Sequence, residues 1–302
     1  MIQAVILSGK GGTGKTTLAG SLADLAARDH QIVLADLDVD AANLELLVQP
    51  SKHKTHPFQS GKMATINQDL CTQCGNCLEA CRFDAVLFQN NKYLIIEDMC
   101  EGCLSCFYQC PVNAVQISQS RSGEWYQSTS LYGELFHASL FPGAENSGKL
   151  VTQVKSAAAQ FCEEKDCELL LLDGPPGTGC PVTAASQGAD LAILVSEPTT
   201  SGMHDLVRIL KVMRHFRVPA YLVINKADLN LNIRNEILET ARQNQLPLLG
   251  EIPYDESIIV LQSQAKPLTS VCDSAATNAI RMIWRRFENV LDGKSGVKNY
   301  GG

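Results

Sequence analysis

The chain has 302 residues, of which 45% are apolar and 19% are charged, and its formal net charge is −7. The length suggests about two domains, and the composition is that of a globular protein with enough apolar residues for a core. The acidic balance disfavours nucleic acid and anionic membranes as partners. No apolar run approaches the about 18 residues needed to span a bilayer, and the N-terminus has no basic leader. We therefore expect a cytoplasmic protein.

The first block of the chain, residues 1–50, reads as strand, glycine loop, helix and strand. Residues 2–7 and 31–37 are apolar runs, and residues 16–28 have helical periodicity. The loop GKGGTGKT, residues 9–16, matches the phosphate-binding pattern G-x-x-x-x-G-K-[ST] in the required context. Its glycines let backbone N–H groups wrap phosphates. We expect Lys15 to reach the β- and γ-phosphates and Thr16 to bind Mg²⁺.

The second block, from about residue 51 to residue 118, carries eight of the twelve cysteines in two runs of one spacing. The runs are Cys71, Cys74, Cys77, Cys81 and Cys100, Cys103, Cys106, Cys110. Each cysteine recurs 29 residues later (100 − 71 = 29), which indicates a duplicated half-domain. The spacing C-x₂-C-x₂-C-x₃-C is that of bacterial ferredoxins, in which the fourth cysteine of each run binds the other cluster.

This pattern predicts two [4Fe–4S] clusters with crossed ligand sets. One set is Cys71, Cys74, Cys77 and Cys110, and the other is Cys100, Cys103, Cys106 and Cys81. Zinc is the rival metal, because four-cysteine zinc sites also use C-x₂-C pairs. A four-cysteine run that occurs twice is much more specific than such pairs and favours iron and sulfur.

The third block returns to alternating strands and helices. Apolar runs at residues 169–172, 191–196 and 221–224 are separated by helical stretches such as 202–216 and 234–245. Alternation predicts an α/β fold with a doubly wound, mostly parallel sheet that binds ligands beyond the carboxyl ends of its strands. We expect a P-loop ATPase domain made of residues 1–58 and 119–302, interrupted by an α+β ferredoxin domain at 59–118. The amphipathic stretch 280–287 is expected to close the core, with membrane binding as the lesser alternative.

The string KGGTGKTT, residues 10–17, resembles the deviant P-loop of the MinD/ParA/Mrp/nitrogenase iron-protein superfamily. The chain as a whole resembles the MinD-like subgroup that carries an inserted two-cluster ferredoxin domain. This resemblance implies an ATPase that forms a homodimer on ATP binding, with Lys10 contacting the nucleotide of the facing subunit. It also implies that Asp38 orients or deprotonates the attacking water and that Asp36 supports the Mg²⁺ shell. From the residues alone, either aspartate could instead be a helix N-cap.

Three further segments follow the order of the family. In DGPPGTG, residues 173–179, Asp173 is expected to hold Mg²⁺ through water and Gly177 to offer its N–H to the γ-phosphate. The segments NKAD, residues 225–228, and IPYD, residues 252–255, flank the base in the family, and Asn225 is expected to read adenine. The expected nucleotide and Mg²⁺ residues are together Gly9, Lys10, Gly11, Gly12, Thr13, Gly14, Lys15, Thr16, Thr17, Asp36, Asp38, Asp173, Gly177, Asn225, Asp228, Pro253 and Asp255, and Lys10, Lys15 and Asp38 are the catalytic ones.

Several residues stand outside these motifs. Cys180 follows Asp173 by seven positions, as a cluster ligand does in the nitrogenase iron protein, so a cluster shared across a dimer is one hypothesis and a small buried residue is the other. Cys162, Cys167 and Cys272 are expected to be packing residues. His53 and His56 are expected to be solvated in a linker. Residues 145–151 have no assigned role.

Three functions remain open from the sequence. The first is a slow, partner-stimulated ATPase whose nucleotide cycle gates electron transfer from the clusters to an unidentified redox protein. The second is a carrier or assembly ATPase for clusters or metal cofactors, which Cys180 favours and the lack of a C-terminal C-x-x-C pair weakens. The third is a redox-sensing positioning protein, against which the acidic charge and the polar C-terminal tail count.

Overall fold

A computed structural model describes residues 1–256, 258, 266–271 and 273–298. The chain divides into two compact units. The first comprises Met1–His56, Glu124–Ser139 and Ser147–Gly302, and the second comprises Pro57–Gly123 and Leu140–Asn146. The second unit takes in Leu140–Asn146, which the sequence places in the ATPase domain.

One sheet organises the first unit. In the described part of the chain its order is β11-β10-β9-β1-β8-β2-β7-β6-β3. The strands are β1 (Ile2–Ser8), β2 (Ile32–Asp36), β3 (Lys52–Ile66), β6 (Val115–Ser130), β7 (Gly133–Leu140), β8 (Leu169–Pro176), β9 (Leu191–Ser196), β10 (Ala220–Asn225) and β11 (Leu248–Ile252). Every neighbouring pair from β11 to β7 is parallel. The mostly parallel α/β sheet predicted from alternation is confirmed.

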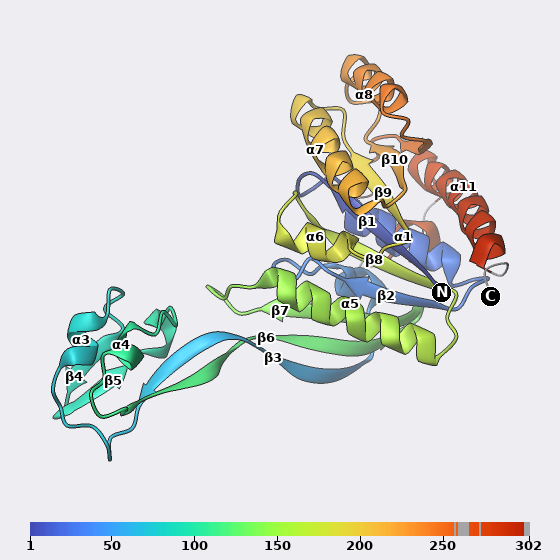
Figure 1. The fold of residues 1–302 in the computed structure, drawn as a ribbon. Helices are drawn as coiled ribbons and strands as arrows, with labels where there is room; N and C mark the ends of the chain where they lie inside the picture. Colours follow the sequence, from blue (N-terminus) through green and yellow to red (C-terminus); the bar gives the residue numbers. More distant parts are fainter. Residues whose placement is uncertain (257, 259–265, 272, 299–302) are drawn as a thin grey trace. The chain divides into compact units, whose positions relative to one another are not determined.

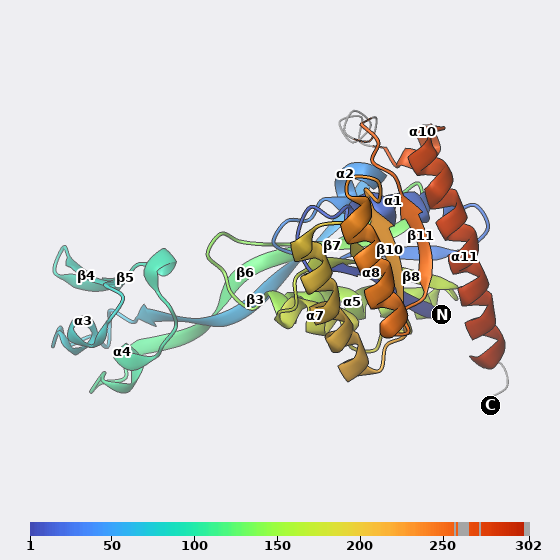
Figure 2. The ribbon, with the colours of Figure 1, turned by 90° about the horizontal axis from the view of Figure 1, so that it is seen from above.

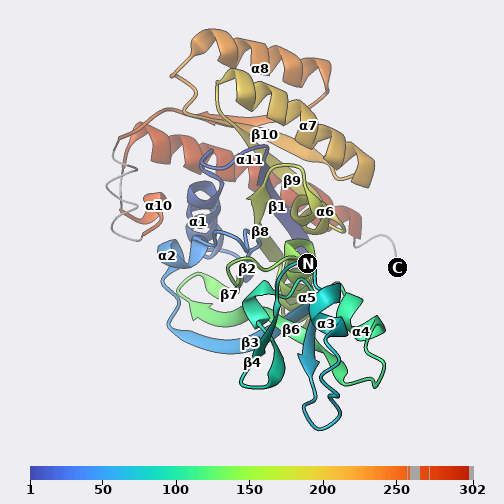
Figure 3. The same ribbon diagram turned by 90° about the vertical axis from the view of Figure 1, so that its left-hand side faces the viewer.

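Helices cover both faces of this sheet, as parallel strands require. On one face lie α1 (Lys15–Ala26), α2 (Leu44–Val48), α10 (Leu268–Val271) and α11 (Ala275–Lys298). On the other lie α5 (Ser147–Glu164), α6 (Cys180–Ser186), α7 (Thr200–Phe216) and α8 (Leu231–Gln243), as Figures 1, 2 and 3 show. The central strands are therefore buried on both sides, which explains their continuous apolar runs.

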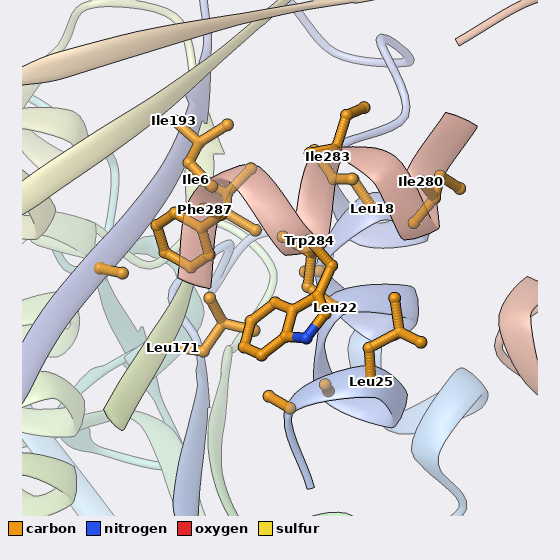
Figure 4. Packing of buried hydrophobic residues seen from close by; sticks show 14 of the residues in the cluster. Ile6, Leu18, Leu22, Leu25, Leu171, Ile193, Ile280, Ile283, Trp284 and Phe287 are labelled. Carbon is orange, nitrogen blue, oxygen red and sulfur yellow. The ribbon is translucent and has the colours of Figure 1, made fainter. Parts of the chain in front are cut away.

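The core on the α1 side is closed by the C-terminal helix. Figure 4 shows side chains of α11 packed against α1 and against strands β1, β8 and β9. Trp284 is 6% exposed and Phe287 is fully buried. The expectation that residues 280–287 close the core is confirmed. Within the described residues, no helix combines the length and apolar character needed to cross a bilayer.

The prediction that His53 and His56 lie in a linker is wrong, because both residues lie in the long strand β3. His53 is exposed but its Nδ1 lies 2.7 Å from Ser128 Oγ, and the His56 ring stacks on Trp125 at 3.9 Å between centroids. The sequence of β3 is mostly polar and contains both proline and glycine, so it lacks the alternation that marks a strand.

The second unit has short elements around a small core. Its helices are α3 (Asn76–Ala80) and α4 (Ser105–Tyr108), with a 3-10 turn η1 (Glu97–Met99), and β4 (Val86–Gln89) pairs antiparallel with β5 (Lys92–Ile95). The core consists of Ala64, Cys77, Val86, Cys106 and Val115. Two of these five buried residues are cysteines of the repeated runs, so this unit is built around its thiols.

Candidate functional site

The glycine loop joins β1 to α1 and brings the amino end of α1 to a hollow. Gly14 is the residue before α1 and has φ +89°. A Cβ at Gly14 would overlap the amide of Asn225, which donates a hydrogen bond from Nδ2 to the Thr13 carbonyl oxygen at 2.8 Å. Glycine is thus required here both by the backbone angle and by the close approach of a second loop.

The hollow in front of this loop measures about 1490 Å³ out to its open mouth. It is lined by the predicted residues Gly11, Gly12, Gly14, Lys15, Thr16, Thr17 and Asp38, and also by Asp40, Ala41, Asn43, Leu46, Leu47, Pro175, Pro176 and Pro181. Three separate segments therefore meet here, namely the loop before α1 with the start of that helix, the segment after β2 with α2, and the end of β8 with the start of α6. They correspond to the phosphate loop and the two switch segments expected from the sequence.

The charged side chains that line the hollow differ in exposure, because Lys15 is buried, Asp38 is half-buried and Asp40 is exposed. Lys15 is 6% exposed, and this burial lowers the pKa of its ammonium group although Asp173, Asp38 and Asp36 oppose the shift. Burial likewise raises the pKa of Asp38, while Lys15 opposes this shift. The site thus concentrates one cation and three carboxyl groups at the carboxyl ends of β2 and β8.

Asp36 and Asp173 face each other in register on β2 and β8 and are almost completely buried. Burial raises the pKa of Asp36 to about 6, although its carboxylate accepts hydrogen bonds from the backbone N–H groups of Asp38, Asn43 and Leu44 at 2.9–3.0 Å. In the structure, therefore, Asp36 shapes the loop that follows β2.

Asp173 lacks such partners. No described residue donates a well-formed hydrogen bond to its carboxylate oxygens, although the Thr16 hydroxyl approaches them, and burial, reinforced by Asp36, raises its pKa against the opposing effects of Thr16 and Lys15. A buried carboxylate without a donor is costly unless a cation compensates it. Asp173 does not itself line the hollow, but the Thr16 hydroxyl, which does, approaches its carboxylate. Oxygen ligands of this kind suit Mg²⁺, so these residues fit the expected metal.

Two predicted residues are engaged within the protein. The Gly177 N–H donates to the Ser8 carbonyl oxygen at 2.9 Å, so it reaches a γ-phosphate only if the segment after β8 moves. Gly9 does not line the hollow, and a Cβ there would overlap Asp205 of α7. Gly9 is thus required for close packing between the loop and α7.

A second hollow adjoins the same loop and shares Gly12, Gly14 and Thr17 with the first. It is lined by Gly12, Gly14, Thr17, Leu18, Asn225, Lys226, Ile252, Pro253, Tyr254, Asp255, Ile258, Leu268 and Ile280. Its largely apolar wall and its few polar groups suit a nucleoside base. Asp228 is not among the lining residues, and its carboxylate accepts the Tyr254 N–H at 2.7 Å, so it holds the loop that forms the wall.

Glu197 was not expected from the sequence and joins Lys10, a predicted site residue, to Lys226, which was not predicted to be one. It is 8% exposed, and its carboxylate lies 3.5 Å from Lys10 Nζ and 2.6 Å from Lys226 Nζ. Lys10, expected to reach into a facing subunit, is thus paired within its own chain in this structure. Glu197 directly follows β9 in no recognised motif, so no sequence pattern pointed to it.

The eight clustered cysteines of the second unit line two separate hollows, each with four thiols. Cys71, Cys74, Cys77 and Cys110 line one of them. Cys81, Cys100, Cys103 and Cys106 line the other. These are the two crossed sets that the spacing predicts, with the fourth cysteine of each run in the hollow of the other.

The duplication is also visible in the backbone. Left-handed residues recur at the 29-residue offset, in the pairs Gln73 and Gly102 (φ +60° and +61°), Gly75 and Leu104 (+85° and +68°), and Asp84 and Asn113 (both +53°). The second member of the middle pair is a leucine, which adopts this angle only at a cost. The two halves therefore present their thiols on closely similar loops.

The thiols do not converge on a point. Among the described residues, no group of three or more His, Cys, Asp or Glu side chains is placed to hold a single metal ion. In a four-iron cube each thiolate binds a different iron, so the sulfurs of one set stand farther apart than the ligands of one ion. Two hollows with four soft donors each fit that group.

The remaining cysteines differ in environment. Cys162 and Cys167 are buried, which confirms that they are packing residues, whereas Cys272 lies outside the described residues. Cys180 is exposed, so it is not the small buried residue of the alternative interpretation. It begins α6, and a Cβ at Gly148, in the first turn of α5, would lie 3.3 Å from its Cβ.

Comparison with known proteins identifies the family. The model of the CobQ/CobB/MinD/ParA nucleotide binding domain matches residues 4–268. The chain belongs to this family. An uncharacterized protein of Methanocaldococcus jannaschii is 34% identical over 291 residues, which are 96% of this chain and 98% of that protein. The septum site-determining protein MinD of Bacillus subtilis is 23% identical over 292 residues, covering 94% of this chain and 87% of MinD.

The fold of this MinD/ParA-type ATPase is shared with solved structures. MinD of Pyrococcus horikoshii, solved in complex with Mg-ADP, superposes with a TM-score of 0.57 at 17% identity and covers 96% of each chain. The resemblance to MinD and ParA inferred from KGGTGKTT is thus confirmed at the level of the family and of the P-loop NTPase fold.

Proposed function

We propose that this MinD/ParA-type protein is a Mg·ATP-dependent ATPase that dimerises around its nucleotide and couples the nucleotide cycle to two [4Fe–4S] clusters, gating electron transfer to a partner redox protein. The observation that carries the proposal is the division of eight cysteines into two four-thiol hollows in a chain that also has a complete phosphate loop.

The nucleotide half rests on the phosphate hollow. Lys15 and the amino end of α1 present positive charge to the phosphates, and Asp173 and Thr16 would hold Mg²⁺. Asp38 lines the same hollow with a raised pKa, which suits a group that orients or deprotonates water. Asn225, Pro253 and Asp255 line the hollow assigned to the base.

Lys10 supplies the link between two subunits. Its side chain is one-third exposed and pairs with Glu197, so it can exchange that partner for a phosphate of a facing subunit. ATP held between two chains would stabilise the closed dimer, and hydrolysis would release it, because the ligand has different affinities for the two states.

The cysteine half rests on the two hollows. Cys71, Cys74, Cys77 and Cys110 would hold one cluster, and the other set would hold the second. Such a cluster, when bound, takes up or releases an electron. Cys74 and Cys103 are exposed, one in each set, so both hollows reach the surface, where a partner can approach.

Metal content tests this half directly. The full chain, purified without oxygen, is expected to contain about eight irons and an equal number of sulfides. Cys77→Ser and Cys106→Ser, one in each hollow, should each lower the iron content, while Cys162→Ser, a buried cysteine outside both hollows, should not. Zinc in place of iron, or iron that does not depend on Cys77 and Cys106, would refute the assignment.

A cluster-carrier function is the second candidate, because Cys180 is exposed at the start of α6. In this alternative Cys180 pairs across a dimer axis and holds a labile, shared cluster. A variant without the eight ferredoxin-type cysteines should then still bind iron after anaerobic reconstitution and release it to an acceptor protein on ATP turnover. Absence of residual iron would remove this candidate.

A positioning function is a third candidate, supported by the similarity to MinD. It predicts that the protein sediments with lipid vesicles or DNA only when nucleotide is bound. Sedimentation that is independent of nucleotide, or none at all, would exclude it.

A further inference from the structure

Four polar side chains connect the segment after β2 with the strands β6, β7 and β3 in the first unit. These side chains, called here the polar relay, are Glu45 in α2, His137 in β7, Ser128 in β6 and His53 in β3. Glu45 Oε2 lies 3.1 Å from His137 Nδ1, His137 Nε2 lies 2.9 Å from Ser128 Oγ, and Ser128 Oγ lies 2.7 Å from His53 Nδ1.

The hydrogen bonds of the relay have one direction. His137 is 4% exposed, and burial lowers its pKa to about 4, with His53 adding to the effect, so its ring is neutral. The carboxylate of Glu45 is partly exposed and can only accept, hence His137 Nδ1 carries the hydrogen. His137 Nε2 then accepts the Ser128 hydroxyl, whose oxygen accepts the N–H of His53. Each group therefore donates toward Glu45.

The relay begins at the nucleotide site. Asp36 accepts the N–H groups of Asn43 and Leu44, so the residue before Glu45 is fixed by a carboxylate that faces Asp173. Asn43 and Leu46, on either side of Glu45, line the phosphate hollow. Any movement of this segment on nucleotide binding moves Glu45, and if Glu45 withdraws, the buried Nδ1–H of His137 loses its acceptor, which is unfavourable.

The relay ends on the strands that lead to the cysteines. β3 begins in the first unit and ends in the second, and β6 begins in the second and ends in the first. We propose that the polar relay transmits the position of the segment after β2 to β3 and β6, and that ATP binding is communicated through it to the cysteine segment carried by these strands. The communication to the clusters rests on the proposed function, because it requires that clusters be bound. The effect of ATP on β3 and β6 does not require bound clusters.

Hydrogen–deuterium exchange on the full-length protein tests the relay without using the clusters as a probe. A nonhydrolysable Mg·ATP analogue should alter amide exchange in β3 and β6 of the wild type by about fivefold or more. Ser128→Ala and Glu45→Ala, which removes the acceptor of the His137 Nδ1–H, should abolish this change while the analogue still protects α1. Both variants should still bind ATP, because neither Ser128 nor Glu45 lines the phosphate hollow. The segment after β2 also stays anchored, because the Asp36 carboxylate accepts hydrogen bonds from backbone N–H groups that neither substitution removes.

Thr129→Val is the matched control. Thr129 donates to Glu134 at 2.9 Å and so also joins β6 to β7, but it does not reach α2. This variant should respond as the wild type does. An unchanged β3 and β6 in the wild type with α1 protected, or a full response in Ser128→Ala, would overturn the relay. Failure of the proposed function would be seen differently. The protein would then contain no iron, or the rate of cluster reduction would not depend on ATP.

Discussion

Replacement of Asp173 by asparagine is expected to stabilise the nucleotide-free protein while it abolishes the use of Mg²⁺. Asp173 is 1% exposed, no described residue donates a well-formed hydrogen bond to its oxygens although the Thr16 hydroxyl approaches them, and Asp36 faces it from β2. In Asp173→Asn the new amide can donate to Asp36, which replaces a repulsion between two buried carboxyl groups by a hydrogen bond.

The magnitude follows from the cost of a buried polar group without a partner, about 1–3 kcal/mol. The free energy of unfolding of Asp173→Asn without ligand should therefore rise by about that amount. Saturating Mg·ATP should add stability to the wild type, about 2.7 kcal/mol at a hundredfold excess over Kd, but little to the variant.

Urea unfolding followed by circular dichroism, with and without Mg·ATP, measures both effects. Asp24→Asn is the control, because Asp24 is also buried, at 9% exposure, but its carboxylate lies 2.8 Å from the Arg28 guanidinium, so its replacement should not stabilise the protein. If Asp173→Asn is less stable than the wild type without ligand, or keeps the full Mg·ATP effect, the assignment of Asp173 to the metal is wrong.

Three further outcomes are expected. The pKa of Asp36 rises from 3.8 to about 6 on folding, so as pH increases its carboxyl group ionises first in the unfolded chain. The ligand-free protein should therefore lose up to about 3 kcal/mol of stability between about pH 4 and about pH 6, which urea unfolding at a series of pH values would show. Asp36→Asn should make the stability depend less on pH over this range. Phe287→Ala should cost about 3–5 kcal/mol in the same assay because Phe287 is fully buried, whereas Met282→Ala, 49% exposed on the same helix, should stay within about 0.5 kcal/mol. Lys10→Ala should lower single-turnover ATP hydrolysis by about 100-fold while ATP binding persists, and unchanged hydrolysis would contradict its role across the dimer.

The parts of the site that depend on local motifs could be predicted from the sequence. The loop before α1 is specified by adjacent glycines and lysines, and the two four-thiol sets follow from a spacing that occurs twice. Strands with continuous apolar runs, such as β8 and β9, were also recognised, because burial on both faces leaves few polar residues in them.

The parts that depend on contacts between distant segments could not be predicted. Glu45 and His137 are 92 residues apart in the sequence (137 − 45). They meet because β7, which carries His137, pairs with β2, and α2, which carries Glu45, follows β2 in the chain. Glu197 binds Lys10 and Lys226 from two other loops. The segment that forms β3 is polar and contains a proline, so its own sequence gives no periodic signal of a strand. It is a strand because it pairs with β6 in the sheet, and this contact cannot be seen from the segment alone.

The rate of cluster reduction measured by stopped-flow absorbance, with and without Mg·ATP, tests the central claim most directly. Coupling predicts that Mg·ATP changes this rate in the wild type. Asp38→Ala should bind ATP without hydrolysing it, so the rate of cluster reduction in this variant should change once on ATP binding and stay at the new value. Identical rates in the presence and absence of Mg·ATP, in a protein that holds its full iron and hydrolyses ATP, would contradict the account.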